Sequence, residues 1–234
     1  MAHLGLAIIV IVVLAVVGFA GYTVYNKSGA GKKASTVTTT ATDKTAAAAD
    51  ETGCVATYKD ENLCKFADVG GKLQDMPFTG TGTVTGGDEA GTFDLQNDGK
   101  NNASFVVKSP SGELSVVVYN GHSYIKSGDS WTDYGTTADD ANPAKGIDLV
   151  LSSGSTYTPQ GKEACGSLTC FKYSLKEASS PNSDQTVWFD TKSYLLRQWK
   201  DIATGDDGTV TTTVMTITYP GKVTISKPSP VVTQ

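Results

Sequence analysis

A series of short turn signals constrains the fold of this chain more than any other feature. The signals are Gly86-Gly87, Asn97-Asp98-Gly99, Asn120-Gly121, Ser127-Gly128-Asp129 and Asp206-Asp207-Gly208. Glycine and asparagine supply the positive backbone φ angles that tight hairpin turns need. Each signal separates two segments rich in residues that favour strands. Because the connections are short, we expect sequential strands to pair antiparallel.

Ten segments have the composition and length of strands. They are 78–85, 91–95, 103–108, 114–119, 123–126, 131–134, 170–176, 186–190, 194–202 and 210–219. Alternation along a strand places Phe171, Tyr173 and Leu175 on one face, with Lys172 and Ser174 on the other. By the same rule Val116 and Val118 share a face, as do Val187 and Phe189. The predicted sheet is therefore apolar mainly on one side.

Two short helices are expected beside these strands. Residues 58–69 place Leu63, Phe66 and Val69 on one side of a helix. Residues 142–153 begin with Asn142-Pro143 and carry the apolar cluster Ile147, Leu149, Val150 and Leu151. A long one-sided sheet with few helices must still cover its apolar face. We therefore predict a mainly β (α+β) fold, a strongly curved antiparallel half-barrel with short helices on its concave face.

The N-terminus is a different kind of segment. Residues 4–20 contain no charged side chain, and the apolar character continues to Tyr25. About 20 apolar residues are needed to cross a bilayer as a helix, so residues 1–25 are predicted to be a single transmembrane anchor. A cleaved signal peptide is the alternative, because Gly18-Phe19-Ala20 offers a cleavage site. The uncharged first residues and the length of the run favour a retained anchor.

Composition divides the rest of the chain. Residues 26–53 are rich in Thr, Ala, Ser, Gly and Lys and are expected to be a flexible linker. A β domain is predicted over 54–228, followed by a short tail over 229–234. The chain has a net charge of −5 and no basic stripe, which argues against nucleic acid as a partner. The expected partner is the membrane, through residues 4–25, and the candidate partners are a lipid or apolar ligand and an envelope protein.

Four cysteines bear on the compartment: Cys54, Cys64, Cys165 and Cys170. An even number behind an export segment predicts two disulfides. Three connectivities are possible, and proximity favours Cys54–Cys64 and Cys165–Cys170. A zinc site is disfavoured by the spacing, and reduced thiols in a cytoplasmic domain are the remaining alternative. Lysines after the apolar run favour a cytoplasmic domain, whereas the cysteines favour a domain outside the cytoplasm, which we prefer.

Motifs for chemistry are sparse. His122 lies beside a predicted turn with no nucleophile motif to serve. The glycines form neither a phosphate-binding loop nor a dinucleotide fingerprint, and the aspartate pairs lack calcium-loop spacing. We therefore predict no catalytic residues, no metal and no cofactor. Trp131, Trp188 and Trp199 are candidates for the core or for the wall of a cavity.

Two motifs resemble a known family. Residues 119–132 (YNGHSYIKSGDSWT) are similar to the hairpin nG-x-x-Y-v-K-x-x-x-x-W of bacterial LppX/LprG-type proteins, in the wider LolA/LolB-like lipoprotein-carrier superfamily. Residues 187–197 (VWFDTKSYLLR) resemble the family's strand–turn–strand v-W-x-D-x-x-t-x-L-x-R, and residues 78–82 resemble its first strand. The resemblance implies a half-barrel with helices across its concave face, in proteins that carry lipids or lipoproteins across the cell envelope. This chain has a predicted protein anchor in place of a lipid-modified cysteine.

The leading hypothesis is a membrane-anchored, extracytoplasmic domain that binds a lipid or other apolar ligand. The candidate ligand-binding residues on the concave face are Val116, Val118, Tyr124, Trp131, Leu149, Phe171, Tyr173, Val187 and Phe189. The alternative is a stalked protein-interaction or envelope-sensing module without a small-molecule ligand. The expected location is the cell membrane, with the C-terminal domain outside the cytoplasm.

Overall fold

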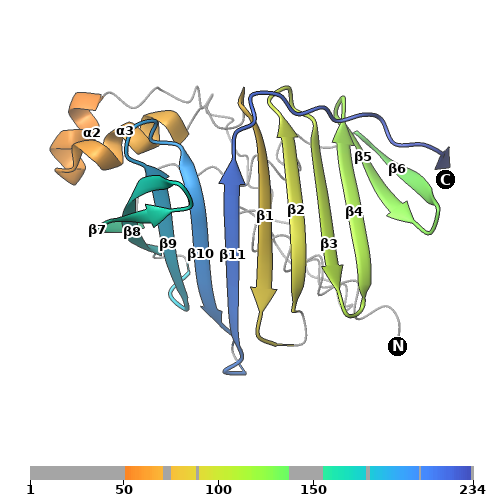
Figure 1. Cartoon of the computed structure of the whole chain (residues 1–234). Helices are drawn as coiled ribbons and strands as arrows, with labels where there is room; N and C mark the ends of the chain where they lie inside the picture. The colour runs from red at the N-terminus through yellow and green to blue at the C-terminus, as the bar shows by residue number, and fades with distance from the viewer. Residues whose placement is uncertain are drawn as a thin grey trace, which may run out of the picture.

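The computed structural model describes residues 51–70, 75–87, 90–136, 155–177, 180–205 and 207–232 (Figure 1). These residues form two helices, α2 (Glu51–Tyr58) and α3 (Glu61–Gly70), and one sheet of twelve strands. The strands are β1 (Pro77–Thr85), β2 (Gly91–Asp98), β3 (Ala103–Ser109), β4 (Gly112–Tyr119), β5 (His122–Ser127), β6 (Ser130–Thr136), β7 (Ser155–Cys165), β8 (Leu168–Glu177), β9 (Ser183–Asp190), β10 (Leu196–Thr204), β11 (Val210–Thr218) and β12 (Val231–Val232).

The order of strands across the sheet is β12-β6-β5-β4-β3-β2-β1-β11-β10-β9-β8-β7. Every pair is antiparallel except β12 with β6. The predicted antiparallel, mainly β class is therefore confirmed. The turns also form as predicted. Asn120 and Gly121 both have positive φ, at 50° and 76°, which is the combination that a tight two-residue hairpin turn requires.

Three elements of the structure differ from the predicted ones. Helix α2 begins at Glu51, inside the predicted linker. Strand β7 was missed because its polar sequence contains Pro159 and Gly161, which are tolerated here because β7 is an edge strand with a bulge between these residues. Strand β12 lies within the predicted tail, where it pairs with β6. The predicted anchor over 1–25, most of the linker and the predicted helix over 142–153 lie outside the described residues.

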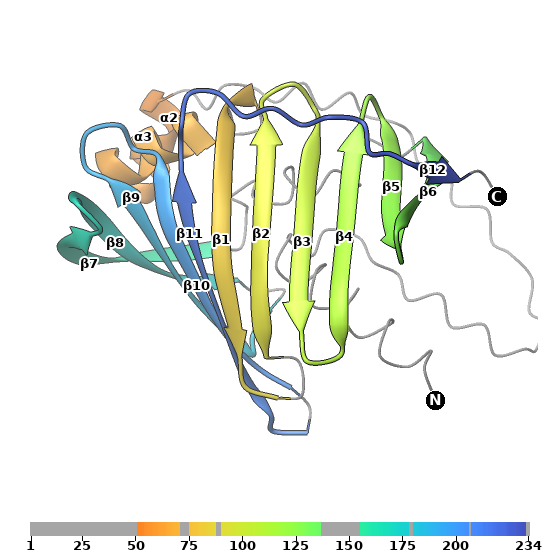
Figure 2. The same cartoon turned by 45° about the vertical axis from the view of Figure 1, so that its right-hand side comes forward.

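The sheet is curved, and its two faces are covered differently. In Figure 2 strands β7 to β9 curl away from the plane of β1 to β4, and both helices lie on the inner side of the curve. The main core lies on this inner face and includes Leu63 and Phe66 of α3. Here "inner face" means the side of the sheet that carries Phe93, Phe105, Trp199 and Met215. It is the concave face that the sequence predicts.

The outer face is crossed by a C-terminal strap, residues 219–230, which leads from β11 to β12 (Figure 2). Ile225 of the strap packs with Val117 and Tyr124, while Val223 and Val231 contribute to the same cluster. The backbone N–H of Trp131 donates a 2.9 Å hydrogen bond to the carbonyl of Pro230. The strap thus buries a second, smaller apolar cluster on the side opposite the main core.

Both disulfides have the predicted connectivity. Cys54–Cys64 joins α2 to α3, and Cys165–Cys170 closes the turn between β7 and β8. Neither described helix is long and apolar enough to cross a bilayer.

Candidate functional site: the inner face of the sheet

The inner face is a nearly continuous apolar surface. Its buried side chains come from β1 to β3 and from β8 to β11 and include Phe78, Phe93, Leu95, Phe105, Tyr173, Val187, Phe189, Trp199, Met215 and Ile217. Strand alternation produces this face directly, since residues two apart point to the same side. Such a surface suits contact with an apolar molecule, whose binding depends on buried area rather than on directed hydrogen bonds.

Gly82 in β1 shapes the middle of this face. Gly82 pairs with Phe93 of β2 and with Met215 of β11. A Cβ atom at position 82 would lie 2.2 Å from Cζ of Phe93 and 2.5 Å from the carbonyl oxygen of Val214. The ring of Phe93 therefore occupies the space that a side chain at 82 would need. The absence of a side chain lets the aromatic ring lie against the strand backbone.

One end of the inner face is closed by helix α3. The ring of Phe66 stacks on Phe189 with centroids 4.4 Å apart and an interplanar angle of 7°. Tyr173 and Phe171 lie 5.2 Å and 5.5 Å from the same Phe189 ring. Close aromatic packing of this kind adds to the energy of buried area. This end of the face is therefore a packed core.

A polar contact locks the helix onto the sheet at that end. Asp60 precedes α3, and its Oδ1 accepts a 3.1 Å hydrogen bond from the backbone N–H of Leu63, as a helix cap does. Its Oδ2 accepts a 2.7 Å hydrogen bond from the hydroxyl of Tyr173. Burial and this contact with Asp60 both raise the pKa of Tyr173. The hydroxyl therefore stays protonated and acts as a donor.

A chain of polar side chains crosses the inner face farther along β9 and β10. Trp199 Nε1 donates to Oε1 of Gln185 at 3.2 Å, and Nε2 of Gln185 donates to Oγ of Ser183 at 3.4 Å. The hydroxyl of Ser183 then donates to Oδ1 of Asp201. Burial raises the pKa of Asp201, against the opposing effect of the Ser183 hydrogen bond. A carboxyl group thus sits on a face that is otherwise mostly apolar.

The predicted ligand-binding residues divide into three groups. Phe171, Tyr173, Val187 and Phe189 come together in or against the main core. Val116 and Val118 also lie on the inner face, since they pair with Phe105 and Ala103 of β3. Tyr124 and Trp131 do not, because they lie in the outer cluster beneath the strap. Leu149 is outside the described residues.

The placement of Tyr124 and Trp131 on the concave face was wrong for a simple reason. Tyr124 pairs with Val117, and Val117 points to the face opposite Val116 and Val118. Aromatic side chains on β5 and β6 were expected to face the main core, but the strap supplies a second apolar environment. The predicted site residues did not include Asp201, Ser183 or Gln185. A signal was available, because Asp201 follows Trp199 by two residues in a predicted strand.

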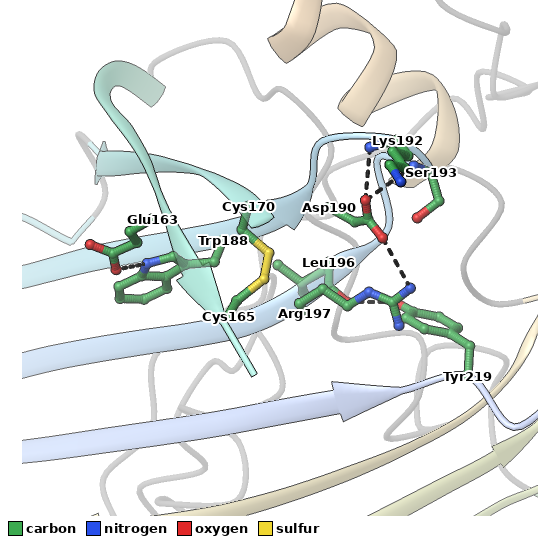
Figure 3. The surroundings of a disulfide bond; sticks show 10 residues. All are labelled: Glu163, Cys165, Cys170, Trp188, Asp190, Lys192, Ser193, Leu196, Arg197 and Tyr219. Atoms are coloured by element: carbon green, nitrogen blue, oxygen red, sulfur yellow. Dashed lines mark hydrogen bonds and ion pairs between the residues drawn. A yellow bond between two sulfur atoms is a disulfide. The ribbon is translucent and has the colours of Figure 1, made fainter. Parts of the chain in front are cut away.

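Figure 3 shows the region around the Cys165–Cys170 disulfide. Oδ1 of Asp190 accepts a hydrogen bond from the backbone N–H of Lys192 at 2.7 Å, and Oδ2 pairs with Nη2 of Arg197 at 3.5 Å. The guanidinium of Arg197 lies 5.0 Å from the ring centroid of Tyr219. Burial acts to raise the pKa of Asp190, but these donors and the Arg197 charge outweigh it, so the pKa is lowered. This network holds the turn between β9 and β10.

The outer face carries two further polar features. A shallow open depression of about 360 Å³ lies over β1 to β4 and is lined by polar residues such as Asp94, Lys108 and Glu113. Nδ1 of His122 lies 3.2 Å from Oδ1 of Asp133, a contact that the sequence did not reveal. Within the described ranges, His122 has no hydrogen bond to a serine or cysteine side chain, and no group of three or more His, Cys, Asp or Glu residues is placed to hold a metal.

Comparison with solved structures identifies the fold. The alignment with the lipoprotein LppX of Mycobacterium tuberculosis covers 70% of this chain and 96% of LppX, with a TM-score of 0.52 and 17% sequence identity. LprF of Mycobacterium bovis aligns over 73% of this chain and 98% of its own, with a TM-score of 0.48 and 18% identity. A MucA/MucB complex of Pseudomonas aeruginosa aligns over 67% of this chain and 56% of the chain in that complex, with a TM-score of 0.39 and 13% identity.

The sequence alone matches no protein-family model and no curated protein. The likeness to LppX nevertheless shows that this chain has the LolA/LolB-like, LppX-type fold that its two motifs predict. The first motif forms β5 and the beginning of β6, and the second forms the end of β9, the following turn and the start of β10. At this level of identity the likeness shows the fold alone.

Proposed function

We propose that this domain binds a lipid or another apolar ligand on the inner face of its sheet, outside the cytoplasm, while residues 1–25 anchor it to the membrane. The observation that carries the proposal is the apolar inner face, which is built from the neighbouring strands β3-β2-β1-β11-β10-β9-β8 of the sheet. The LppX-type fold and the two disulfides support it.

Retention at the membrane would change what such a domain does with its ligand. A free carrier diffuses with its cargo, whereas an anchored domain can only capture, sense or hand over a ligand within reach of its linker. The predicted linker over 26–53 overlaps α2 by a few residues at its end. The anchor and the linker belong to the proposal and rest on sequence alone.

Native mass spectrometry of the full chain, purified from membranes in detergent and followed by organic extraction, tests this function. We expect a bound species of lipid mass that is released by the solvent. A second assay is the fluorescence of the apolar dye N-phenyl-1-naphthylamine, which should increase on binding and decrease when a lipid displaces the dye. A protein with no extractable lipid and no dye binding would contradict the proposal and favour the stalked interaction module.

Two neighbouring valines supply a matched pair of variants. Val107 of β3 pairs with Phe93 and packs against the main core, whereas Val106 points to the outer face. Both side chains are half-buried. We expect Val107→Gln to weaken dye binding by about tenfold, because it places an amide in the apolar site. Val106→Gln should leave dye binding unchanged, and equal effects of the two variants would place the ligand elsewhere.

A further inference from the structure

The inner face contains a polar position that an apolar ligand alone does not explain. Asp201 follows Trp199 by two residues in β10, and the register between β10 and β11 is regular there, so both side chains point inward. Asp201 pairs with Thr213, which is buried, and with Gln185. The carboxyl group therefore lies on the ligand-facing side of the sheet.

The hydrogen bonds around Asp201 all run in one direction. Trp199 donates to Gln185, Gln185 donates to Ser183, and Ser183 donates to Oδ1 of Asp201. The chain therefore ends on an acceptor. Within the described part of the chain, no donor reaches the second oxygen, Oδ2, and no cation is paired with this carboxylate.

A half-buried carboxylate without a counter-charge is costly for a fold. Burial raises the pKa of Asp201, which is the signature of that cost. Asparagine at this position would keep an acceptor for Ser183 without the charge. A ligand group that donates a hydrogen bond to Oδ2 would offset the cost only in the bound state.

We propose that Asp201 receives the head group of an amphiphile, and that this head group is a hydrogen-bond donor, a hydroxyl or an amine, attached to an apolar chain that lies along the inner face. Charge complementarity favours this class, since the polar chain around Asp201 ends on an acceptor. Apolar side chains of the main core, which include Val187 and Met215, lie farther along the same face. The inference rests on the proposed function and adds the orientation and chemistry of the ligand.

Three probes with the same twelve-carbon chain test the head group: dodecylamine, 1-dodecanol and dodecyl methyl ether, which has no donor. Each competes with N-phenyl-1-naphthylamine for the full chain. We expect dodecylamine to displace the dye at about one tenth of the concentration that the ether needs. A charge-assisted hydrogen bond from the head group raises affinity by roughly tenfold over a head group that makes none. Dodecanol should lie between them.

Asp201→Asn is the matching variant, and it should reduce the advantage of dodecylamine over the ether to less than about threefold. Asp184→Asn is the control. It makes the same chemical change on neighbouring β9, where Asp184 is exposed and forms an ion pair with Lys176. This control should keep the full preference, so it separates a specific contact from general attraction of an amine to an acidic protein.

The outcomes separate the two proposals. If all three probes displace the dye equally in the unmodified protein, the head-group inference is overturned while apolar binding stands. The head-group inference is also overturned if Asp201→Asn and Asp184→Asn change the preference for dodecylamine over the ether to the same extent. If neither the dye nor any probe binds, both proposals are overturned. The three-probe comparison on the unmodified protein does not depend on either variant folding.

Discussion

The hydroxyl of Tyr173 donates a 2.7 Å hydrogen bond to Oδ2 of Asp60, although 113 residues separate the two in sequence. Tyr173 lies in the middle of β8, and Asp60 caps α3. The contact fastens the helix to the inner face next to the stacked rings of Phe66 and Phe189. One carboxylate thus serves the helix through Oδ1 and the sheet through Oδ2.

Tyr173→Phe should lower the free energy of unfolding by about 1 kcal/mol, because it removes this hydrogen bond and keeps the ring. Asp60→Ala should cost about 2 kcal/mol, since it removes the helix cap as well. Urea unfolding followed by circular dichroism measures both. The double variant should be less destabilised than the sum of the two, and strict additivity would contradict the contact. Tyr134→Phe, at an exposed tyrosine, is the control.

Gly82→Ala should destabilise the protein by about 2 kcal/mol, because the new methyl group overlaps the Phe93 ring and the backbone of Val214. Gly53→Ala should have the opposite effect. Gly53 lies in helix α2 with no atom near a new Cβ, and alanine favours a helix over glycine by up to about 1 kcal/mol. In thermal unfolding, the melting temperature should therefore fall for Gly82→Ala and rise for Gly53→Ala. A neutral Gly82→Ala would show that Phe93 lies elsewhere.

Asp190→Asn should destabilise the fold at pH 7 by about 2 kcal/mol, because Asp190 accepts from Lys192 and pairs with Arg197. The pKa of Asp190 is lowered in the folded protein, so its contribution is present above the pKa of the unfolded chain and is lost as pH falls through the folded pKa. The difference from the unmodified protein should therefore shrink below about pH 4. A difference that is constant with pH would contradict this account.

Asp201→Asn should show the reverse dependence. The folded pKa of Asp201 is raised by burial, so ionisation costs stability as pH rises from the unfolded pKa through the folded pKa. The variant should therefore be more stable than the unmodified protein at pH 7 and about equal to it near pH 3. Unfolding at several pH values checks the sign. A variant that is less stable at pH 7 would show that the carboxylate supports the fold.

Ile225→Ala should free the strap from the outer face, because Ile225 is its buried anchor against Val117 and Tyr124. We expect a loss of about 2 kcal/mol. The emission of Trp131, isolated by replacing the other two tryptophans with phenylalanine, should shift to longer wavelength as the cluster opens to water. Val210→Ala, at an exposed valine, is the control. An unchanged emission would mean that the cluster does not depend on the strap.

The strands and turns were largely predictable because local chemistry sets them. Asn120-Gly121 forms a tight turn wherever it lies between two strand-forming segments. The alternation of Phe171, Tyr173 and Leu175 marks a face without reference to any other strand. The pairing of Cys165 with Cys170 was favoured by their closeness in sequence, since they are 5 residues apart. Strand β7 was not predicted, because an edge strand tolerates proline and glycine residues that would interrupt a central strand.

The sequence by itself determined a mainly β chain, the apolar side of most strands and two family-like strand–turn–strand motifs, because each depends on neighbours within a few residues. It favoured the observed disulfide pairs among three possible connectivities. Only the tertiary structure decided that Tyr124 and Trp131 face the strap and that Asp60 meets Tyr173. It alone showed that the Trp199–Gln185–Ser183 chain ends on Asp201. These relations join residues distant in sequence, and the packing of the whole sheet sets them.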